Sequence, residues 1–220
     1  MKVGIFGGTF NPIHYGHLRA AEEVRERLAF DKILFIPSGK PPLKTEELTD
    51  AIHRYKMTGL AIGENCFFEL SDIECKQPGK SYTVKTVEEL KETNPGIEFS
   101  FILGIDAFLD IINWWHPERL ITLTNFVIIS RPDFRFIDLQ LSSYMKIKKK
   151  ILKELDNGGI KIYTIKLKSN MDAVLLRLTP IGISSTKVRE LLKEGKSIKY
   201  LLPAKVESYI IANKLYSICP

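Results

Sequence analysis

Short apolar segments alternate with amphipathic segments of helical periodicity along most of the chain. Four apolar segments have the length and composition of buried strands: 3–6, 32–36, 98–103 and 126–129. A weaker strand pattern lies at 67–70. Helical patterns follow the first three strands, at 18–30, about 50–62 and 82–92. This alternation predicts an α/β fold, a Rossmann-like doubly wound parallel sheet with helices on both faces.

The pattern changes in the last third of the chain. Residues 161–168 nearly alternate between apolar and polar, with a slip of phase near Thr164 that predicts a β-bulge or strand bend. A last short strand is predicted at 175–178, followed by helices at 186–193 and 203–215. No interdomain linker interrupts the sequence. We therefore expect a single domain over 1–220, with a Rossmann-like core at 1–182 and a small C-terminal helical part at 183–220.

The formal net charge of +6 is compatible with an anionic small substrate, with nucleic acid or simply with solubility. Much of the excess comes from five lysines: Lys146, Lys148, Lys149, Lys150 and Lys153. No aromatic residues alternate with them, as base-stacking surfaces require. We interpret this run as a solvated helix face and expect no nucleic-acid partner.

Membrane and secretion signals are weak in this sequence. The apolar stretch at 120–129 is interrupted by polar residues and is far shorter than a membrane span. The N-terminus lacks the apolar core of a signal peptide. Cys66, Cys75 and Cys219 are odd in number and lack metal-ligand spacing. We expect a cytoplasmic protein with reduced thiols and no membrane partner.

The first candidate site follows the first predicted strand. Gly7-Gly8 ends that strand, and His14 and His17 stand where the next helix begins. The motif is neither a dinucleotide-binding glycine fingerprint nor a Walker loop. Histidines three apart on a first helical turn face the same way, and the unpaired N–H groups there bind phosphate oxygens. The alternative is that His14 caps a turn and His17 packs on the sheet. No third carboxylate or thiol lies in the motif, so we predict no metal site.

A second candidate site lies at 183–189, before another helical pattern. Ser184 and its neighbouring hydroxyls are good N-cap residues. Lys187 and Arg189 stand where a capping box has an acid, and cations in a first turn oppose the helix dipole. An external anion would reverse the sign of that interaction. The alternative is that both are surface residues on a capped helix.

Four strand-to-loop exits meet at one edge of a parallel sheet, where ligands bind: 7–17, 37–44, 104–106 and 131–132. Trp114 and Trp115 are either core residues or a surface on which a planar ring stacks. Lys44 is either solvated or steers a phosphate. These residues predict a cleft for a phosphorylated molecule that carries a flat ring.

Together these motifs resemble the HxGH nucleotidyltransferase superfamily and, within it, the bacterial nicotinate-nucleotide adenylyltransferases. The matching segments are 7–18, 81–84, 103–106, 114–115, 130–132 and 183–189, and the tail at 201–216 is also similar. The resemblance covers essentially the whole chain. The first and last motifs point to the superfamily, and the middle ones to the nicotinate branch.

The resemblance implies that ATP and nicotinate mononucleotide react to give deamido-NAD and pyrophosphate in NAD biosynthesis. Mg²⁺ accompanies ATP, and no covalent enzyme intermediate forms. A phosphate nucleophile is already anionic, so positioning and charge stabilisation suffice. This agrees with the residues, which provide phosphate donors and no nucleophile–base pair.

The resemblance also implies a role for each matching residue. His14, His17 and Arg189 are the implied catalytic residues, and His17 stabilises the α-phosphoryl group in the transition state. The implied ATP site consists of Gly7, Gly8, Thr9, Phe10, His14, His17, Gly104, Asp106, Ser184, Thr186 and Arg189. The implied nicotinate mononucleotide site consists of Thr9, Lys44, Thr83, Trp114, Trp115 and Arg131.

Three positions depart from the pattern that the resemblance leads us to expect. Asn11 replaces an acid, Leu43 a histidine and Trp115 a tyrosine. Alternative functions are a sister enzyme acting on nicotinamide mononucleotide or phosphopantetheine, and a non-catalytic nucleotide-binding regulator. The intact histidines argue against the regulator. The sequence leaves open whether the chain forms a homo-oligomer.

Overall fold

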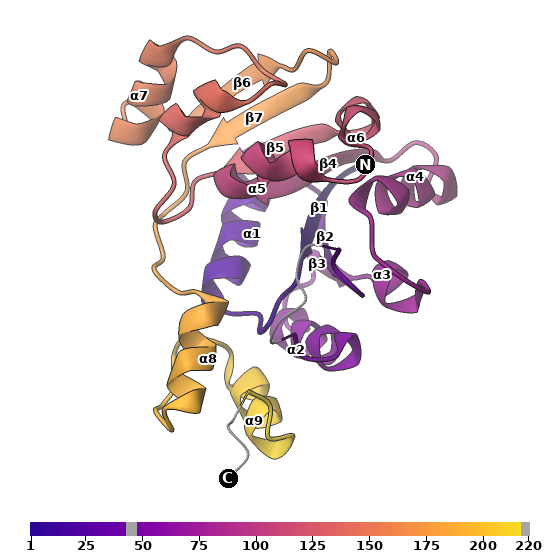
Figure 1. Ribbon diagram of the computed structural model, residues 1–220, viewed down its shortest axis with the longest axis vertical. Coiled ribbons are helices and arrows are strands. Elements are labelled where there is room, and N and C mark those ends of the chain that lie inside the picture. Colours follow the sequence, from indigo (N-terminus) through magenta and orange to yellow (C-terminus); the bar gives the residue numbers. More distant parts are fainter. Residues whose placement is uncertain (43–47, 217–220) are drawn as a thin grey trace.

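The computed structural model describes residues 1–42 and 48–216. In this part of the chain, seven strands form one sheet in the order β3-β2-β1-β4-β5-β7-β6 (Figure 1). The strands are β1 (Lys2–Gly8), β2 (Lys32–Pro37), β3 (Phe68–Leu70), β4 (Glu98–Gly104), β5 (Asn125–Ile129), β6 (Ile162–Lys166) and β7 (Asp172–Leu176). All neighbours are parallel except β6, which pairs antiparallel with β7 at one edge. The predicted α/β Rossmann-like class is confirmed.

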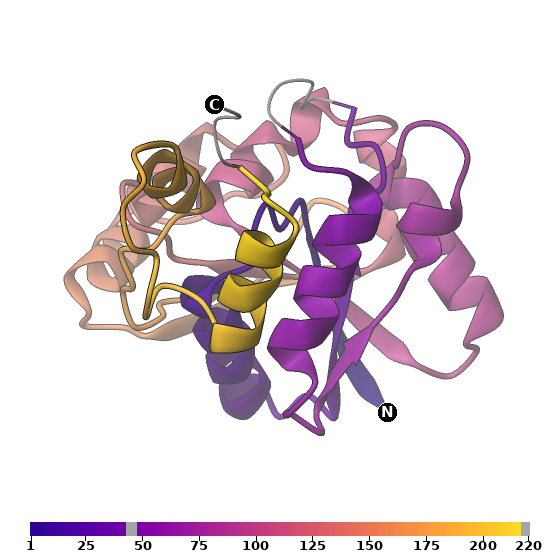
Figure 2. The ribbon, with the colours of Figure 1, turned by 90° about the horizontal axis from the view of Figure 1, so that it is seen from below.

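Helices cover both faces of the sheet. They are α1 (Tyr15–Leu28), α2 (Ala51–Ile62), α3 (Ile73–Lys76), α4 (Thr83–Thr93), α5 (Ile105–Asp110), α6 (Pro117–Leu123), α7 (Lys149–Asn157), α8 (Ser185–Lys193) and α9 (Ala204–Ala212), with 3₁₀ turns η1 (Ile111–Asn113) and η2 (Phe136–Leu141). Helix α9 returns from the end of the chain to lie beside α2 (Figure 2). Among residues 1–42 and 48–216, every helix is too short or too polar to cross a lipid bilayer.

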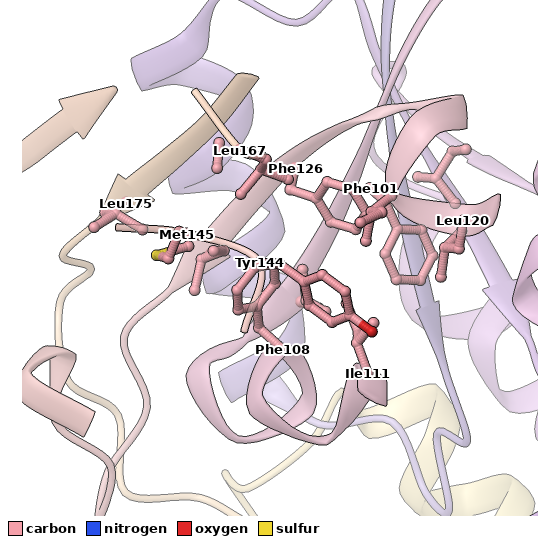
Figure 3. Close-up of a cluster of buried hydrophobic side chains, with 14 of the residues drawn as sticks. Phe101, Phe108, Ile111, Leu120, Phe126, Tyr144, Met145, Leu167 and Leu175 are labelled. Atoms are coloured by element: carbon pink, nitrogen blue, oxygen red, sulfur yellow. The ribbon is translucent and has the colours of Figure 1, made fainter. Parts of the chain in front are cut away.

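Two hydrophobic clusters lie on the two faces because neighbouring strand residues point in opposite directions. In β1, Ile5 belongs to the cluster that also takes side chains from α4, α5, α6 and α7. Phe6 belongs to the other cluster, with side chains from α1, α2, α8 and α9. Figure 3 shows part of the first cluster, where Phe101 of β4 and Phe126 of β5 lie near Phe108 of α5. Both faces are covered, so continuous apolar strands are expected.

The bulge predicted near Thr164 is wrong. Strand β6 pairs with β7 in unbroken register, with Thr164 opposite Val174. Tyr163, Ile165 and Leu167 alternate toward the protein in regular order, whereas Ile162 is 45% exposed on the outer face. An exposed isoleucine therefore caused the apparent slip of phase. The next strand lies earlier than predicted, because Leu178 is buried beyond the end of β7 and not within it.

One strongly basic segment, 146–168, lies at the α7–β6 end of the molecule, opposite α8 and α9 (Figure 1). Segment 146–168 contains eight lysines and two carboxylates, which equals the excess of +6 of the whole chain. The five clustered lysines are exposed, as expected for a solvated face, and Lys146 and Lys148 precede α7. Of the eight, Lys166 alone forms an ion pair within the described residues, with Asp172.

Candidate functional site

One cleft of about 1540 Å³ opens at the carboxyl ends of β1, β4 and β5. It is lined by fifteen of the predicted site residues: Gly7, Gly8, Thr9, Phe10, His14, His17, Thr83, Gly104, Asp106, Trp114, Trp115, Arg131, Ser184, Thr186 and Arg189. Lys44, like Leu43, lies outside the described residues. The four strand exits and the start of α8 therefore meet at one place, although they are far apart in the sequence.

The glycine turn after β1 is held by a buried aromatic residue. Phe10 is 3% exposed and has a φ of +46°, a backbone conformation that is uncommon outside glycine. Its ring packs against Phe6 and Phe35. A Cβ atom on Gly8 would lie 3.0 Å from the Phe10 ring. The close approach of this ring explains the glycine, and the packing holds the turn in its uncommon conformation.

His14 and His17 form a stacked pair at the start of α1. His14 is the N-cap residue, its backbone N–H donates to Nδ1 of His17 at 3.3 Å, and the ring centroids are 3.8 Å apart. Because Nδ1 of His17 accepts, the neutral ring carries its proton on Nε2. A Cβ atom on Gly16 would lie 2.9 Å from Cε1 of His14, so the glycine makes room for the stack.

His14 is electrically neutral at physiological pH. The side chain is 5% exposed, and this burial, together with the charge of Arg131, lowers its pKa from 6.5 to about 4. Its Nδ1 is buried and has no hydrogen-bond partner within the described residues. His17 meanwhile packs edge-on against Phe10 and also lines the cleft, so packing and ligand contact are compatible.

The first turn of α8 is joined to the loop before α1. Ser184 caps the helix by accepting from the backbone N–H of Lys187 at 3.1 Å, as predicted. Arg189 donates to the backbone oxygen of Asn11 at 2.9 Å and lies near the hydroxyl of Thr186. The two helix starts thus form one unit at the cleft.

Lys187 does not take part in the cleft. Its Nζ pairs with Glu190 at 3.5 Å on the surface, whereas Arg189 lines the cleft. Of the two cations expected at this helix start, Arg189 lies in the cleft and Lys187 does not.

Asp106 and Arg131 form an ion pair with a nitrogen–oxygen distance of 3.0 Å. A Cβ atom on Gly104 would lie 2.3 Å from Oδ1 of Asp106 and 2.4 Å from Cδ of Arg131. A larger residue at the end of β4 would displace both side chains. The resemblance assigns Asp106 to the ATP site and Arg131 to the nicotinate mononucleotide site. In the structure the two side chains are in contact on one wall of the cleft.

Trp114 and Trp115 differ in their surroundings. Trp114 is half-buried against Phe101, and its Nε1 donates to Asp110 at 3.2 Å. Trp115 is 42% exposed and stacks on Tyr82 at 4.7 Å between centroids. Trp114 thus belongs to the wall of the cleft, and Trp115 offers an open aromatic surface.

Sequence reasoning missed three residues next to these walls. Tyr82 supports Trp115, Tyr216 donates to Oδ1 of Asn11 at 2.8 Å, and Arg54 lies beneath the glycine turn. The amide of Asn11 serves as an acceptor here, so its replacement of an acid keeps that contact. Within residues 1–42 and 48–216, no three His, Cys, Asp or Glu side chains gather where they could hold a metal ion.

Comparisons with known proteins agree with this geometry. A family model described as cytidylyltransferase-like matches residues 5–191. Proteins named probable nicotinate-nucleotide adenylyltransferase, from Geotalea daltonii and Geobacter sulfurreducens, are 41% and 40% identical and align over 99% of each chain. A solved structure of Plasmodium falciparum nicotinic acid mononucleotide adenylyltransferase complexed with NaAD has a TM-score of 0.72 and 25% identity, covering 98% of this chain and 97% of that one.

Proposed function

The chain belongs to the cytidylyltransferase-like family, and from that premise we propose that it transfers the adenylyl group of ATP to nicotinate mononucleotide. The products are deamido-NAD and pyrophosphate, and the reaction is a step of NAD biosynthesis. The observation that carries the proposal is the pair of helix starts, at His14 and Ser184, that face one cleft. Relatives of about 40% identity over their full length support the choice of substrate.

In this reaction an oxygen of the 5′-phosphate of the mononucleotide attacks the α-phosphorus of ATP. The bond between the α-phosphorus and the bridging oxygen breaks, and pyrophosphate leaves with that oxygen. The nucleophile is already ionised, so the protein need not remove a proton. Its work is to align the two phosphates and to stabilise negative charge as it develops.

The residues of the cleft have different roles in this reaction, according to their charge and position. His17 donates from Nε2 to the α-phosphoryl oxygens, and the neutral imidazole of His14 lies beside the same chain of phosphates. Arg189 and the free N–H groups at the start of α8 hold the β- and γ-phosphates. Mg²⁺ arrives with ATP as part of the substrate, bound to its phosphates.

The nicotinate ring lies near the aromatic wall. Trp115 offers the exposed face on which a planar ring stacks, and Thr83 begins α4 beside it. Nicotinamide mononucleotide and phosphopantetheine are the alternative acceptors. An acid and an amide differ in hydrogen-bonding groups, and a site that leaves one buried partner unpaired rejects the wrong ring strongly.

The direct test is pyrophosphate release from Mg·ATP with nicotinate mononucleotide, nicotinamide mononucleotide or phosphopantetheine in turn. We expect release with the first and a much lower kcat/KM with the others. Lys187→Ala is a matched control, because Lys187 lies in the same helical turn as Arg189 but outside the cleft. No release with nicotinate mononucleotide from a folded protein contradicts the proposal.

A further inference from the structure

Helix α2 carries an arginine that is completely enclosed by protein. The side chain of Arg54 is 0% exposed, whereas arginines almost always keep their charged end in water. It does not line the cleft. Burial lowers the pKa of its guanidinium, which shows that the charge is held in a poorly solvated place.

The guanidinium binds three separate segments of the chain. Its Nε donates to the backbone oxygen of Thr49 at 2.8 Å, Nη1 to that of Thr9 at 2.8 Å and Nη2 to that of Gly39 at 2.7 Å. A longer contact of 3.4 Å joins Nη1 to the hydroxyl of Ser38. The rigid fork of donors in arginine suits such divergent acceptors, and a lysine ammonium does not.

No carboxylate of the described residues lies within ion-pair distance of Arg54; the acceptors are backbone oxygens and one hydroxyl. The buried carboxyl of Glu74 acts on it through its charge, but its Oε1 accepts from Thr86 at 2.9 Å. Removing a cation from water without an ionic partner costs several kcal/mol. An apolar side chain at this position would avoid that cost but would leave three backbone oxygens without their donor.

The bound segments are the walls of the cleft. Thr9 lies between Gly8 and Phe10 in the turn that leads to the histidines, and Ser38 lines the cleft from the exit of β2. On its far side the Ser38 turn is fixed by Ser81, whose Oγ accepts from the N–H of Gly39 at 3.0 Å. Sheet pairing joins β1 and β2 up to the hydrogen bond from the N–H of Ser38 to the oxygen of Gly8, and Arg54 ties the two turns together beyond it.

We propose that Arg54 is a positioning residue for the nucleotide cleft. It holds the Thr9 turn and the Ser38–Gly39 turn at the separation that places the two substrates in line. Arg54 therefore affects the substrates through these two turns. The inference rests on the proposed adenylyl transfer. If Arg54 only stabilises the fold, the fully folded variants will keep normal kinetics.

The test compares Arg54→Lys, which keeps the charge, with Arg54→Met, which keeps much of the volume. Both are assayed well below their measured Tm, with circular dichroism to establish that they are folded. Displaced reacting groups lower turnover steeply, so we expect kcat to fall by about 10- to 100-fold in both variants, with a smaller change in KM. Arg119→Lys, at an exposed arginine paired with Glu88, is the control and keeps normal kinetics. Normal kcat and KM in folded Arg54→Lys overturn the inference.

A second variant covers the case in which Arg54 variants do not fold. Ser81→Ala removes the clamp on the Ser38 turn and leaves the buried cation in place. We expect a fall in kcat of about threefold to tenfold, equivalent to roughly one hydrogen bond. An unchanged kcat in folded Ser81→Ala contradicts the inference.

A failure of the proposed function can be told apart from a failure of the Arg54 inference. If the unmodified protein releases no pyrophosphate with nicotinate mononucleotide, the reaction is wrong. The Arg54 inference is then tested by titrating ATP and following tryptophan fluorescence. Weaker ATP binding by about threefold in folded Arg54→Lys, in line with the smaller change expected for KM, supports it, and equal binding overturns it.

Discussion

The two helix starts at the cleft, at α1 and α8, differ in charge and burial. At α1 the cap is the imidazole of His14, which is buried and neutral, and His17 stacks on it. At α8 the cap is the hydroxyl of Ser184, and Arg189 brings a permanent positive charge. A permanent charge binds an anion equally well before and during reaction, whereas a fixed neutral donor suits charge that develops in the transition state. We therefore expect the α1 start to serve kcat and the α8 start to serve ATP affinity.

The sharpest test of this division is His17→Ala. We expect kcat to fall by about 10²- to 10³-fold with little change in KM for ATP, by analogy with the loss of an oxyanion donor. Steady-state pyrophosphate release measures both constants. Near-normal turnover would show that His17 does not stabilise the transition state and serves only to pack against Phe10.

The buried neutral state of His14 predicts a pH dependence of stability. Between pH 6.5 and about pH 4 the unfolded chain takes up a proton on this imidazole and the folded protein does not. The free energy of unfolding therefore falls on acidification, by about 3 kcal/mol across the window. Urea unfolding at pH 7 and pH 4.5 measures this fall, and His14→Gln reduces it. An equal fall in that variant shows that His14 is not its source.

At the other helix start, Arg189→Ala tests ground-state binding. We expect KM for ATP to rise about 10-fold and kcat to change less, because a charge-assisted hydrogen bond contributes about 1.5 kcal/mol. Lys187→Ala, in the same helical turn but paired with Glu190 outside the cleft, leaves both constants unchanged. A fall in kcat without a change in KM would show that the α8 start, like the α1 start, acts in the transition state.

The smallest effect is expected for the cap of α8. Ser184→Ala removes the acceptor for the N–H of Lys187 and lowers the free energy of unfolding by about 1 kcal/mol. Urea denaturation measures the change. Stability equal to that of the unmodified protein shows that water replaces the hydroxyl at no cost.

Both helix starts could be predicted from the sequence because their signals are local. The glycines and histidines of 7–17 lie within one turn and one helix start, and the hydroxyls of 183–189 precede a periodic segment. The central strands are apolar throughout because the sheet is covered on both faces. Such features depend on near neighbours, so periodicity and capping rules describe them well.

The remaining features depend on distant contacts. Arg54 resembles any helical surface arginine until Thr9, Gly39 and Thr49 are brought around it. The ion pair of Asp106 with Arg131 likewise joins the exits of two strands. Helices α3 and α5 span four and six residues, too short for a 3.6-residue period to become visible. Local sequence patterns carry no information on distances between residues that are far apart in the sequence.

Strand β6 forms one outer edge of the sheet, and its sequence decides how the molecule behaves in concentrated solution. The free side of an edge strand offers unpaired N–H and C=O groups on which a second molecule could add a strand. Lys161, Lys166 and Lys168 frame this edge and lie beside the cationic α7. Two such edges repel each other over about one Debye length, roughly 10 Å at 0.1 M salt. The positive charge beside β6 thus opposes the pairing of two molecules along this edge.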